Sequence, residues 1–536
     1  MSMGFKARWV KSVFRALVIG AVLPVLGLMA KEPGEDTRYP PAVDFPAGVD
    51  WFNVSRPLTL KDLHGRVVVL DFWTYGCINC IHVLADLKRL EAKYGDDLLV
   101  VGIHTPKFDN EKNPSTLRRI IVRYGIRHPV VNDSHYVLAQ IYGMRAWPTQ
   151  VVIDPDGRVL GKVVGEDNYT VLDKVIAEQL KQRGSQRKLA QIPIALEKEK
   201  FSTSLLAAPG KVSVSAQYVA IADTLHNRIV VTDHHGRVQQ IYGDGRPGLR
   251  DGSAATARFR APQGMAFLGG KLYVADTGNH VIRQLDLPDA SSHASTIDVT
   301  TVAGNGSHKL HRRAQFGATA IGLRSPWALA GDKSSLYIAM AGAHQIWTLD
   351  LAHQRIRPFA GDGREGLRDG DLQVASFSQP SGLALIGAHL FVADAEDSAV
   401  RRIDLKRKRV STLVGQGLFD FGDEDGRFSE ALLQHVLGIA ATSTQQIYIA
   451  DTYNHKIKKL DRMHEIVETV VGTGRPGKGL GAGLRSALNE PGGLAIFEGG
   501  LLIADTNNDR LVYYDFDSRE LTDWPVTFGL VGANMM

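Results

Sequence analysis

The distribution of hydrophobic positions divides the chain into two parts with different periodicity. In the first part, the apolar run VVVLDFW occupies residues 67–73, and apolar side chains then recur at helical spacing from Ile78 to Leu90. A short run rich in β-branched residues is typical of a buried parallel strand, whereas the spacing that follows predicts an amphipathic helix. The first part is therefore predicted to be an α/β unit.

The second part is a repeat with a long period. Six segments of one type begin at Val219, Leu272, Leu336, Leu390, Ile447 and Leu501. One position of the segment carries an aspartate in every copy except the third, and its residues are Asp223, Asp276, Met340, Asp394, Asp451 and Asp505. These positions lie 53 to 64 residues apart, and each copy reads as the four short antiparallel strands of a propeller blade. We predict an all-β, six-bladed propeller.

Long segments between the blades share Gly, Asp-Gly and Ala-x-Phe/Leu positions. They cover residues 243–264, 361–382, 415–438 and 472–493. We expect them to emerge on one face of the disc, where propellers bind partners, or else to plug and stiffen the ring. The repeat aspartates recur as catalytic residues would, but an Asx turn that fixes the strand connection explains them more simply.

The two periodic parts define the domain boundaries. We assign residues 31–180 to the α/β domain, residues 181–200 to a basic connector, and residues 201–530 to the propeller. Composition agrees with a multidomain globular protein, since 44% of the 536 residues are hydrophobic and 22% are charged. The net charge of +5 is small for this length and does not indicate nucleic-acid binding. The basic run at 406–409 is predicted to be a solvated hairpin turn.

The first 30 residues carry a targeting pattern. The apolar run of residues 16–30 is shorter than the ~20 residues needed to span a bilayer. Basic side chains precede it at Lys6, Arg8, Lys11 and Arg15. This pattern predicts a signal peptide, with an uncleaved N-terminal anchor as the alternative. We therefore expect an exported, periplasmic or otherwise extracytoplasmic protein that meets a membrane only through this segment.

Candidate chemistry concentrates at the two cysteines. Cys77 and Cys80 lie where the predicted strand meets the predicted helix, and the free N–H groups of a helix N-terminus lower the pKa of a cysteine. This placement favours a redox pair over a structural disulfide, because closing a loop of about four residues contributes only about 2 kcal/mol. A zinc site that includes His82 is disfavoured, since the chain has no further cysteine. We expect neither a metal nor another cofactor.

The residues around the cysteines extend the pattern. The string DFWTYGCINC at residues 71–80 resembles the active-site segment of thioredoxins and of their periplasmic TlpA-like relatives. Residues 144–165, MRAWPTQVVIDPDGRVLGKVVG, resemble the second signature of that family, in which a cis-proline faces the cysteines. The resemblance implies an α/β thioredoxin-like fold and makes Pro148 the cis-proline.

The resemblance also implies catalytic roles. Cys77 would be the attacking thiolate and the more exposed of the pair, and Cys80 would resolve the mixed disulfide, so that the two cysteines form a disulfide with each other. Asp71 matches the buried acid of thioredoxins. It would have a raised pKa and accept the proton of Cys80, or else be a satisfied acid at a strand end.

A substrate surface follows from the same resemblance. Trp73 and Tyr75 would flank the cysteines as packing and substrate surface. Trp147, Pro148 and Thr149 would face an extended strand of a protein substrate and pair with its backbone.

Two departures from the thioredoxin pattern leave the direction of the reaction open. Gly76 stands where thioredoxins have Trp, and Ile78-Asn79 replaces Gly-Pro. Because these positions tune thiolate stability, the chain could be a reductant, an oxidant or an isomerase. The residues from Thr74 to Cys77 also match the T-x-x-C of peroxiredoxins, although Leu70 replaces the proline that opens that motif.

The blades resemble NHL repeats. A thioredoxin-like unit followed by six such blades resembles the family of NHL-repeat-containing protein 2 and its bacterial relatives. We expect an exported thiol–disulfide oxidoreductase whose propeller face holds a protein thiol or disulfide partner near Cys77. The alternatives are a non-catalytic propeller scaffold with a vestigial thioredoxin-like unit, and a thiol peroxidase.

Overall fold

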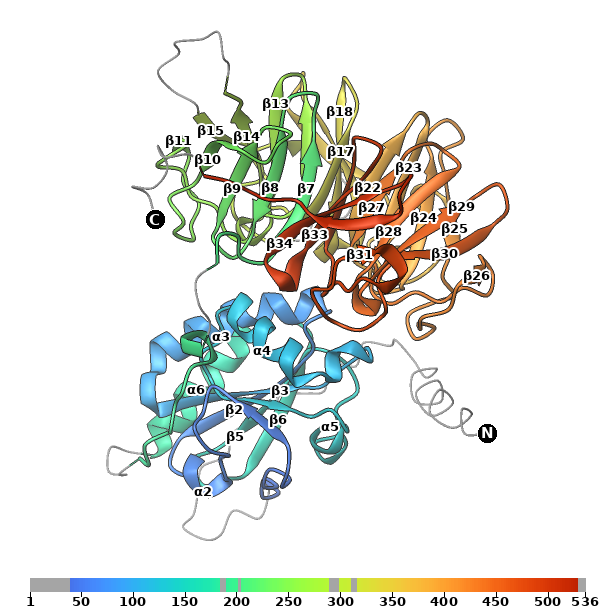
Figure 1. The fold of residues 1–536 in the computed structure, drawn as a ribbon. Coiled ribbons are helices and arrows are strands. Elements are labelled where there is room, and N and C mark those ends of the chain that lie inside the picture. Colours follow the sequence, from blue (N-terminus) through green and yellow to red (C-terminus); the bar gives the residue numbers. More distant parts are fainter. Residues whose placement is uncertain (1–38, 184–188, 201–203, 289–297, 310–315, 529–536) are drawn as a thin grey trace, which may run out of the picture.

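Two domains in contact make up the described part of the chain (Figure 1). The computed structural model describes residues 39–183, 189–200, 204–288, 298–309 and 316–528. The predicted signal peptide or anchor, residues 1–30, lies outside these ranges. Among the described helices, none is long and apolar enough to cross a membrane.

A six-stranded mixed sheet forms the centre of the N-terminal domain, in the order β1-β4-β3-β2-β5-β6. Its strands are β1 (Asp50–Phe52), β2 (Val67–Trp73), β3 (Leu98–His104), β4 (Val130–Asn132), β5 (Thr149–Ile153) and β6 (Val159–Val164). β2, β3 and β4 run parallel, and β1, β5 and β6 pair antiparallel with their neighbours. The strand predicted at residues 67–73 coincides with β2 in the interior of this sheet.

Helices cover both faces of the sheet. They are α2 (Leu60–Leu63), α3 (Ile78–Tyr94), α4 (Pro114–Arg123), α5 (Val137–Ile141) and α6 (Tyr169–Arg183), with the 3-10 turns η1 (Gly95–Asp97), η2 (Asn110–Lys112) and η3 (Glu197–Lys200). Val67 and Val69 of β2 pack against α3 and α6, whereas Val68 and Leu70 pack on the opposite face with α2 and α5. Because side chains alternate along a strand, Asp71 falls in the row of Val67 and Val69, beneath α3.

The connector folds back on this domain. α6 ends at Arg183, three residues beyond the predicted domain boundary at residue 180. Further on, the N–H of Ala195 donates to the carbonyl of Asn53 at 2.9 Å, and the N–H of Glu197 donates to Asn53 Oδ1 at 2.9 Å. Arg118 pairs with the Glu197 carboxylate at 2.7 Å. The later part of the connector therefore belongs to the surface of the N-terminal domain.

The C-terminal domain is a ring of six antiparallel sheets, which confirms the predicted propeller. Four strands form the core of each blade. Blades one to three contain β7 (Pro209–Val214), β8 (Val219–Asp223), β9 (Arg228–Thr232) and β10 (Val238–Tyr242); β12 (Met265–Leu268), β13 (Lys271–Asp276), β14 (Val281–Asp286) and β15 (Asp298–Ala303); and β17 (Pro326–Gly331), β18 (Ser335–Met340), β19 (Gln345–Asp350) and β20 (Arg355–Ala360). Blades four to six contain β22 (Pro380–Ile386), β23 (His389–Asp394), β24 (Ala399–Asp404) and β25 (Arg409–Val414); β27 (Gly438–Ala441), β28 (Gln446–Asp451), β29 (Lys456–Asp461) and β30 (Ile466–Val471); and β32 (Gly493–Phe497), β33 (Gly500–Asp505), β34 (Arg510–Asp515) and β35 (Glu520–Asp523).

Short elements complete the blades. Blades two to six each carry a two-residue fifth strand at one edge, namely β11 (Gly252–Ser253), β16 (Phe316–Gly317), β21 (Gly370–Asp371), β26 (Gly426–Arg427) and β31 (Gly481–Ala482). The 3-10 turns are η4 (Thr277–Asn279), η5 (Ala341–Ala343), η6 (Thr452–Asn454), η7 (Gly483–Arg485) and η8 (Thr506–Asn508). The basic run at 406–409 lies at the exposed turn between β24 and β25, as predicted.

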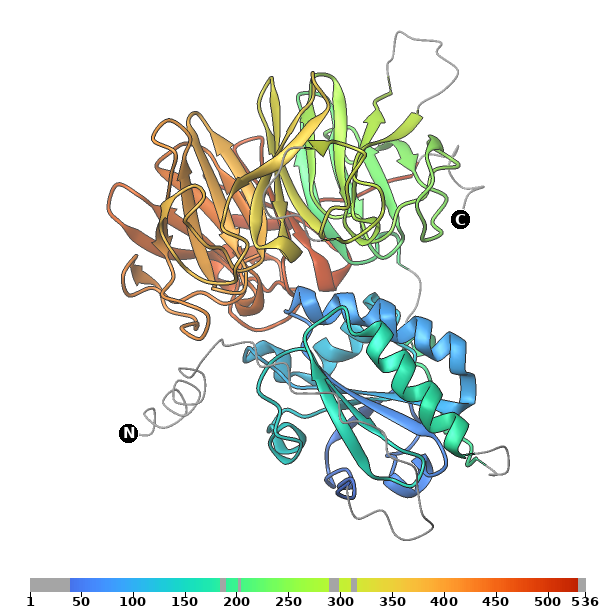
Figure 2. The same cartoon turned by 180° about the vertical axis from the view of Figure 1, so that it is seen from behind.

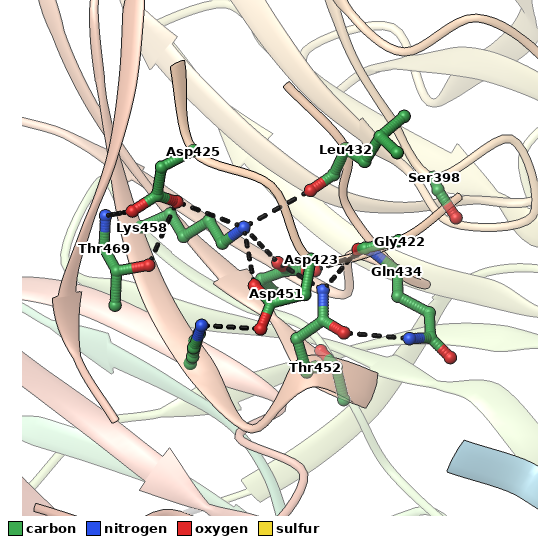
Figure 3. Close-up of polar contacts among 12 residues, drawn as sticks. Ser398, Gly422, Asp423, Asp425, Leu432, Gln434, Asp451, Thr452, Lys458 and Thr469 are labelled. Atoms are coloured by element: carbon green, nitrogen blue, oxygen red, sulfur yellow. Dashed lines mark hydrogen bonds and ion pairs between the residues drawn. The ribbon is translucent and has the colours of Figure 1, made fainter. Parts of the chain in front are cut away.

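The four long segments between the blades supply four of these fifth strands, β11, β21, β26 and β31. β11 lies in the segment that follows blade one, yet it pairs with β15 of blade two. Beside the corresponding strand of blade five, Asp425 accepts hydrogen bonds from the N–H and Oγ1 of Thr469 at 2.7 and 3.0 Å (Figure 3). Equivalent aspartates in blades two and four are Asp251 and Asp369. The segments therefore bind each blade to the next and stiffen the ring.

The repeat aspartates are structural, but they do not form the predicted Asx turns. In blade five, Asp451 makes no side-chain bond that caps its own turn. It instead accepts from the N–H of Gln434 at 2.7 Å and from Asn454 Nδ2 at 2.8 Å, and it pairs with Lys458 Nζ at 3.2 Å (Figure 3). A carboxylate that joins the preceding loop, the turn and a buried cation explains the recurrence, because each of these groups is buried and needs a partner.

The end of the chain closes the ring. Blade one has only four strands of its own. At its outer edge the N–H of Thr527 donates to the carbonyl of Gly236 at 2.8 Å, and the N–H of Val238 donates to the carbonyl of Thr527 at 2.9 Å. A segment that follows blade six therefore occupies the edge where the other blades carry a fifth strand.

Candidate active site

The two cysteines lie at the start of α3, directly after β2. Cys77 is the N-cap residue of the helix, and Cys80 lies in its first turn. Both are free thiols. Cys77 is 7% exposed and Cys80 is fully buried, so Cys77 is the more exposed of the two, but much less accessible than an attacking thiol was expected to be.

The environment shifts the pKa values of the two thiols in opposite directions. A hydrogen bond from Cys80 and the charge of Lys107 lower the pKa of Cys77 and outweigh the effect of burial. Burial, the bond to Cys77 and the nearby charge of Asp71 raise the pKa of Cys80 well above its ordinary value. This asymmetry has the sign required of an attacking and a resolving thiol.

Asp71 lies beneath the helix that carries the cysteines. It is fully buried, and burial raises its pKa to about 6, although a bond from Gln150 Nε2 and the charge of His128 oppose the rise. The Gln150 bond is 2.9 Å long and reaches Oδ1. Among the described residues, the second oxygen, Oδ2, has no hydrogen-bond partner.

The segment around Pro148 lies beside the cysteines. The Trp147–Pro148 peptide bond is cis. Trp147 Nε1 donates to the carbonyl of Thr105 at 2.8 Å, and Thr149 Oγ1 donates to the carbonyl of Ala146 at 2.7 Å. Trp147 is half-buried, whereas Pro148 and Thr149 are buried, so this arrangement leaves no open surface for an extended substrate strand at the last two residues.

Trp73 and Tyr75 are core residues, which corrects the prediction that they form substrate surface. The Trp73 side chain is fully buried in a cluster that includes both cysteines. Tyr75 is buried too: its ring stacks on His104 at 5.5 Å, and its hydroxyl donates to Glu490 Oε1 of the propeller at 3.1 Å. Tyr75 is inaccessible because the propeller covers it, whereas Trp73 is buried within the N-terminal domain, where its indole lies over Gly102.

The propeller is seated on the end of α3 that carries the cysteines, as Figures 1 and 2 show from opposite sides. The contact closest to the site comes from Gln379, which precedes β22. Its Oε1 accepts from the N–H of Ile78 at 2.8 Å, and its Nε2 donates to the carbonyl of Gly76 at 2.9 Å. One propeller side chain therefore binds the backbone on both sides of Cys77.

An ion pair crosses the same interface. Lys107 of the N-terminal domain pairs with Glu396 of blade four, and its Nζ also lies 3.9 Å from Glu365 Oε1. Burial works against the ammonium charge, but these carboxylates and Cys77 together raise the pKa of Lys107. The ammonium therefore stays charged close to Cys77, where it favours the thiolate.

Aromatic and polar contacts extend the interface around this centre. Phe108 packs against Phe421, His435 and Tyr453, at ring-centroid distances of 4.9, 5.1 and 5.5 Å. Further bonds join Asn110 to Gln434, Glu490 and His455, Arg123 to Asn507, and His82 to Ser325. The face of the propeller that was expected to hold a partner thus holds the chain's own N-terminal domain.

The geometry gives no support to zinc at the cysteines. His82, the third ligand considered, bonds to Glu166 Oε2 and Ser325 Oγ at 2.7 Å each. In the described ranges, no group of three or more His, Cys, Asp or Glu residues is arranged to hold a metal ion.

Comparison with known proteins agrees with the two domains. A thioredoxin-like family model matches residues 65–159, and an NHL-repeat model matches residues 433–460. NHL repeat-containing protein 2 from Bos taurus is 39% identical over 524 residues, which covers 90% of this chain and 71% of that protein. The chain belongs to the family of NHL repeat-containing protein 2.

Two further relatives differ in how much they share with this member of the NHL repeat-containing protein 2 family. Protein SUPPRESSOR OF QUENCHING 1, chloroplastic, from Arabidopsis thaliana is 42% identical over 509 residues, which covers 89% of this chain. The chain spans only 47% of the length of that protein. Thiol-disulfide oxidoreductase ResA from Bacillus anthracis is 28% identical over 119 residues, which covers 22% of this chain and 66% of that protein.

The sequence analysis of this NHL repeat-containing protein 2 relative did not identify the interface residues. One position of the repeat nevertheless differs between blades in a way that indicates them. A position one to four residues before the first strand of each blade has a left-handed backbone in all six copies. Its residues are Ala208, Ala261, Ser325, Gln379, His435 and Glu490. In blades three to six this residue is polar, and in each of these blades it contacts the thioredoxin-like domain. Glu396 likewise lies in a turn, DAEDS, that departs from the D-T-x-N-H of blades two and five.

Proposed function

We propose that the chain catalyses thiol–disulfide exchange at Cys77 and Cys80. One observation carries the proposal: two hydrogen-bonded thiols at a helix N-terminus have pKa values shifted in opposite directions, above a buried carboxyl group. The similarity of residues in the first domain to a thiol–disulfide oxidoreductase supports the same chemistry.

The exchange uses each of the three groups in turn. The Cys77 thiolate attacks one sulfur of a substrate disulfide, and the other sulfur leaves as a thiolate that takes a proton from solvent. Cys80 then gives its proton to the Asp71 carboxylate and attacks Cys77 Sγ, which releases the second substrate sulfur. Two electrons have passed to the substrate, and Cys77 and Cys80 are joined as a disulfide. The reverse sequence oxidises a dithiol.

Access to Cys77 has to be opened for a protein substrate, because the propeller leaves only 7% of this residue exposed. We assign this control to the interface formed by Gln379 and the Lys107–Glu396 pair. A protein partner that draws the propeller aside would expose Cys77 to its own disulfide. We place the activity outside the cytoplasm, since residues 1–30 have the pattern of a signal peptide.

Burial of both thiols favours a second candidate, a non-catalytic scaffold whose propeller shields an unused cysteine pair. Peroxidase chemistry has no comparable support. A threonine that acts on the cysteine of a T-x-x-C motif has to direct its hydroxyl toward that cysteine. Here Thr74 Oγ1 instead donates to Glu111 Oε2 at 2.6 Å.

Trapping in the full-length protein tests the proposal. Cys80→Ser should accumulate mixed disulfides through Cys77, because the resolving thiol is missing, and Cys77→Ser is the matched control that should trap nothing. Redox titration of the unaltered protein should also show a reversible Cys77–Cys80 disulfide. If both variants trap nothing and the thiols titrate as two independent cysteines, the chain is not an oxidoreductase and the hypothesis of a non-catalytic scaffold is favoured.

A further inference from the structure

A row of unpaired polar atoms lies on the sheet beneath α3. Asp71 Oδ2, Gln150 Oε1, Trp73 Nε1 and His128 Nε2 are buried and have no hydrogen-bond partner among the described residues. The sheet register places Asp71 between Gln150 of β5 and Gly102 of β3. Buried polar groups in native proteins are nearly always paired, so a cluster of four marks a place where another hydrogen-bonding species belongs.

Gly102 makes room for this cluster. A Cβ atom at this position would lie 3.1 Å from Trp73 Nε1 and 3.4 Å from His128 Nε2. Both ring nitrogens therefore converge above a backbone that has no side chain, next to Asp71 in the register. Two ring nitrogens and a carboxyl oxygen, all without a hydrogen-bond partner among the described residues, can be joined by one bridging water, which typically makes about three hydrogen bonds.

His128 connects this interior to the surface. Its Nδ1 lies 3.1 Å from Glu91 Oε1, and the Glu91 side chain is 28% exposed. The imidazole also borders a surface pocket of about 400 Å³. The other residues that line the pocket are Lys88, Glu91, Ala92, Leu99, Arg127, Pro129 and Ile194. All belong to the thioredoxin-like domain and its connector, so this pocket is formed without the propeller that closes the cysteine side.

We propose that His128 relays protons between Asp71 and this pocket, as a positioning residue that acts on the exchange reaction through Asp71. The inference rests on the proposed function. The proton that Cys80 loses passes to Asp71 Oδ2, then through the bridging water to His128 Nε2, while the proton on Nδ1 leaves to Glu91 and solvent. No electrons move in the relay. It returns Asp71 to its carboxylate form without opening the domain interface.

The charged groups around the relay favour this direction. Asp71 faces Cys80 of α3, whose thiol it makes harder to ionise, and the positive form of His128 stabilises the Asp71 carboxylate. His128 faces Glu91 of α3, and Lys88 and Arg127 also line its pocket. On the far side of Trp73, burial lowers the pKa of His104 to about 4, so this second imidazole is neutral and cannot substitute for His128.

A two-step reaction in the full-length protein tests the relay. A chromogenic aromatic disulfide releases one coloured thiolate when Cys77 attacks and a second when Cys80 resolves the mixed disulfide. His128→Gln should leave the first release unchanged and slow the second about tenfold near neutral pH, because proton removal from Asp71 is impaired. The pH inflection of the second release should move upward, since His128 no longer lowers the pKa of Asp71 in the variant.

Matched variants separate a relay from a structural role. Arg127→Gln changes an exposed neighbour that lines the same pocket and should alter neither release. Added imidazole should restore the second release in His128→Ala, and His128→Gln decides the matter if that variant does not fold. If the first release is so slow that it limits the rate of the second, the midpoint potential of the Cys77–Cys80 couple is measured against pH instead. The pH at which the slope of that plot changes, which reports the pKa of Asp71, should be higher in His128→Gln.

The outcomes of the experiment are distinct. An unaltered protein that releases no second thiolate contradicts the exchange reaction itself, and the relay with it. An unaltered protein that releases both, beside a His128→Gln variant with the same rate, inflection and potential, contradicts the relay alone.

Discussion

Lys107 and Glu396 form an ion pair that joins the two domains beside Cys77. One partner lies in the thioredoxin-like domain and lowers the pKa of Cys77, and the other is supplied by a propeller turn. Residues of both domains therefore influence the pKa of Cys77. The consequences can be measured in the intact protein.

Lys107→Gln should raise the pKa of Cys77, because a nearby positive charge that favours the thiolate is removed. Glu396→Gln should lower it, since the carboxylate that compensates Lys107 is lost. The measurement is the rate of alkylation of Cys77 against pH. Lys112→Gln is the control, because Lys112 pairs with Asp109 at the surface. Equal pKa values in all four proteins would show that the ion pair does not act on the thiol.

Gln379→Ala should expose Cys77. The variant loses two hydrogen bonds to the backbone around the cysteine, each contributing about 1 kcal/mol, and alkylation limited by opening should become about thirtyfold faster. Gln416→Ala offers a matched control, because that side chain bonds to Ser429 within the propeller at 3.0 Å. Unchanged protection of Cys77 from a bulky alkylating reagent would mean that the Gln379 bonds do not hold the interface closed.

Asp71→Asn should stabilise the fold at neutral pH. The pKa of Asp71 is raised to about 6 in the folded protein, so the folded state binds more protons than the unfolded state between the ordinary value and 6. Stability from this group is full at low pH and is lost as the pH rises through 6. The variant should gain up to about 3 kcal/mol above that pH and nothing below about pH 4. Urea unfolding at both pH values measures this difference.

The matched control for that experiment is Asp109→Asn, which changes an exposed carboxylate. It should show no such pH dependence. The resolving step should nevertheless be slower in Asp71→Asn, because the amide cannot accept the proton of Cys80. A variant that is both more stable and fully active would assign Asp71 the alternative role of a strand-end acid.

Lys458→Met should destabilise the propeller by about 3–5 kcal/mol, because it leaves the buried carboxylate of Asp451 without its cation. Lys459→Met is the control on the same strand. Lys459 pairs with Glu468 near the surface and contributes about 0–1 kcal/mol. Thermal unfolding compares the two variants. Equal melting temperatures would contradict the structural role given to the repeat aspartates.

Local patterns of the sequence were sufficient to predict the main helix and strand elements of both domains. The apolar run 67–73 is β2, the helix begins at Ile78 with Cys77 at its N-cap, and the repeat produces six blades. These features depend on contacts close in sequence or on a period that recurs. The fifth strands of blades two to six were missed, because strands of two residues leave no periodic pattern.

The docking of the domains could not be predicted from such patterns. Its contacts join residues far apart in the sequence, such as Ile78 with Gln379, 301 positions apart, and Tyr75 with Glu490, 415 positions apart. A thioredoxin-like active site is ordinarily expected to face solvent, and the resemblance therefore suggested exposed aromatic surface at Trp73 and Tyr75. Only the assembled ring shows that polar side chains at one repeat position converge on the cysteines.

Closure of the ring by Thr527 bears on the order of events during synthesis. The outer edge of blade one is completed by a residue at the far end of the chain, whereas the thioredoxin-like domain is complete by residue 200. Domains generally fold in the order in which they are synthesised. The cysteines are therefore uncovered until the last blade has been made, and the finished propeller closes over two thiols that were exposed before it formed.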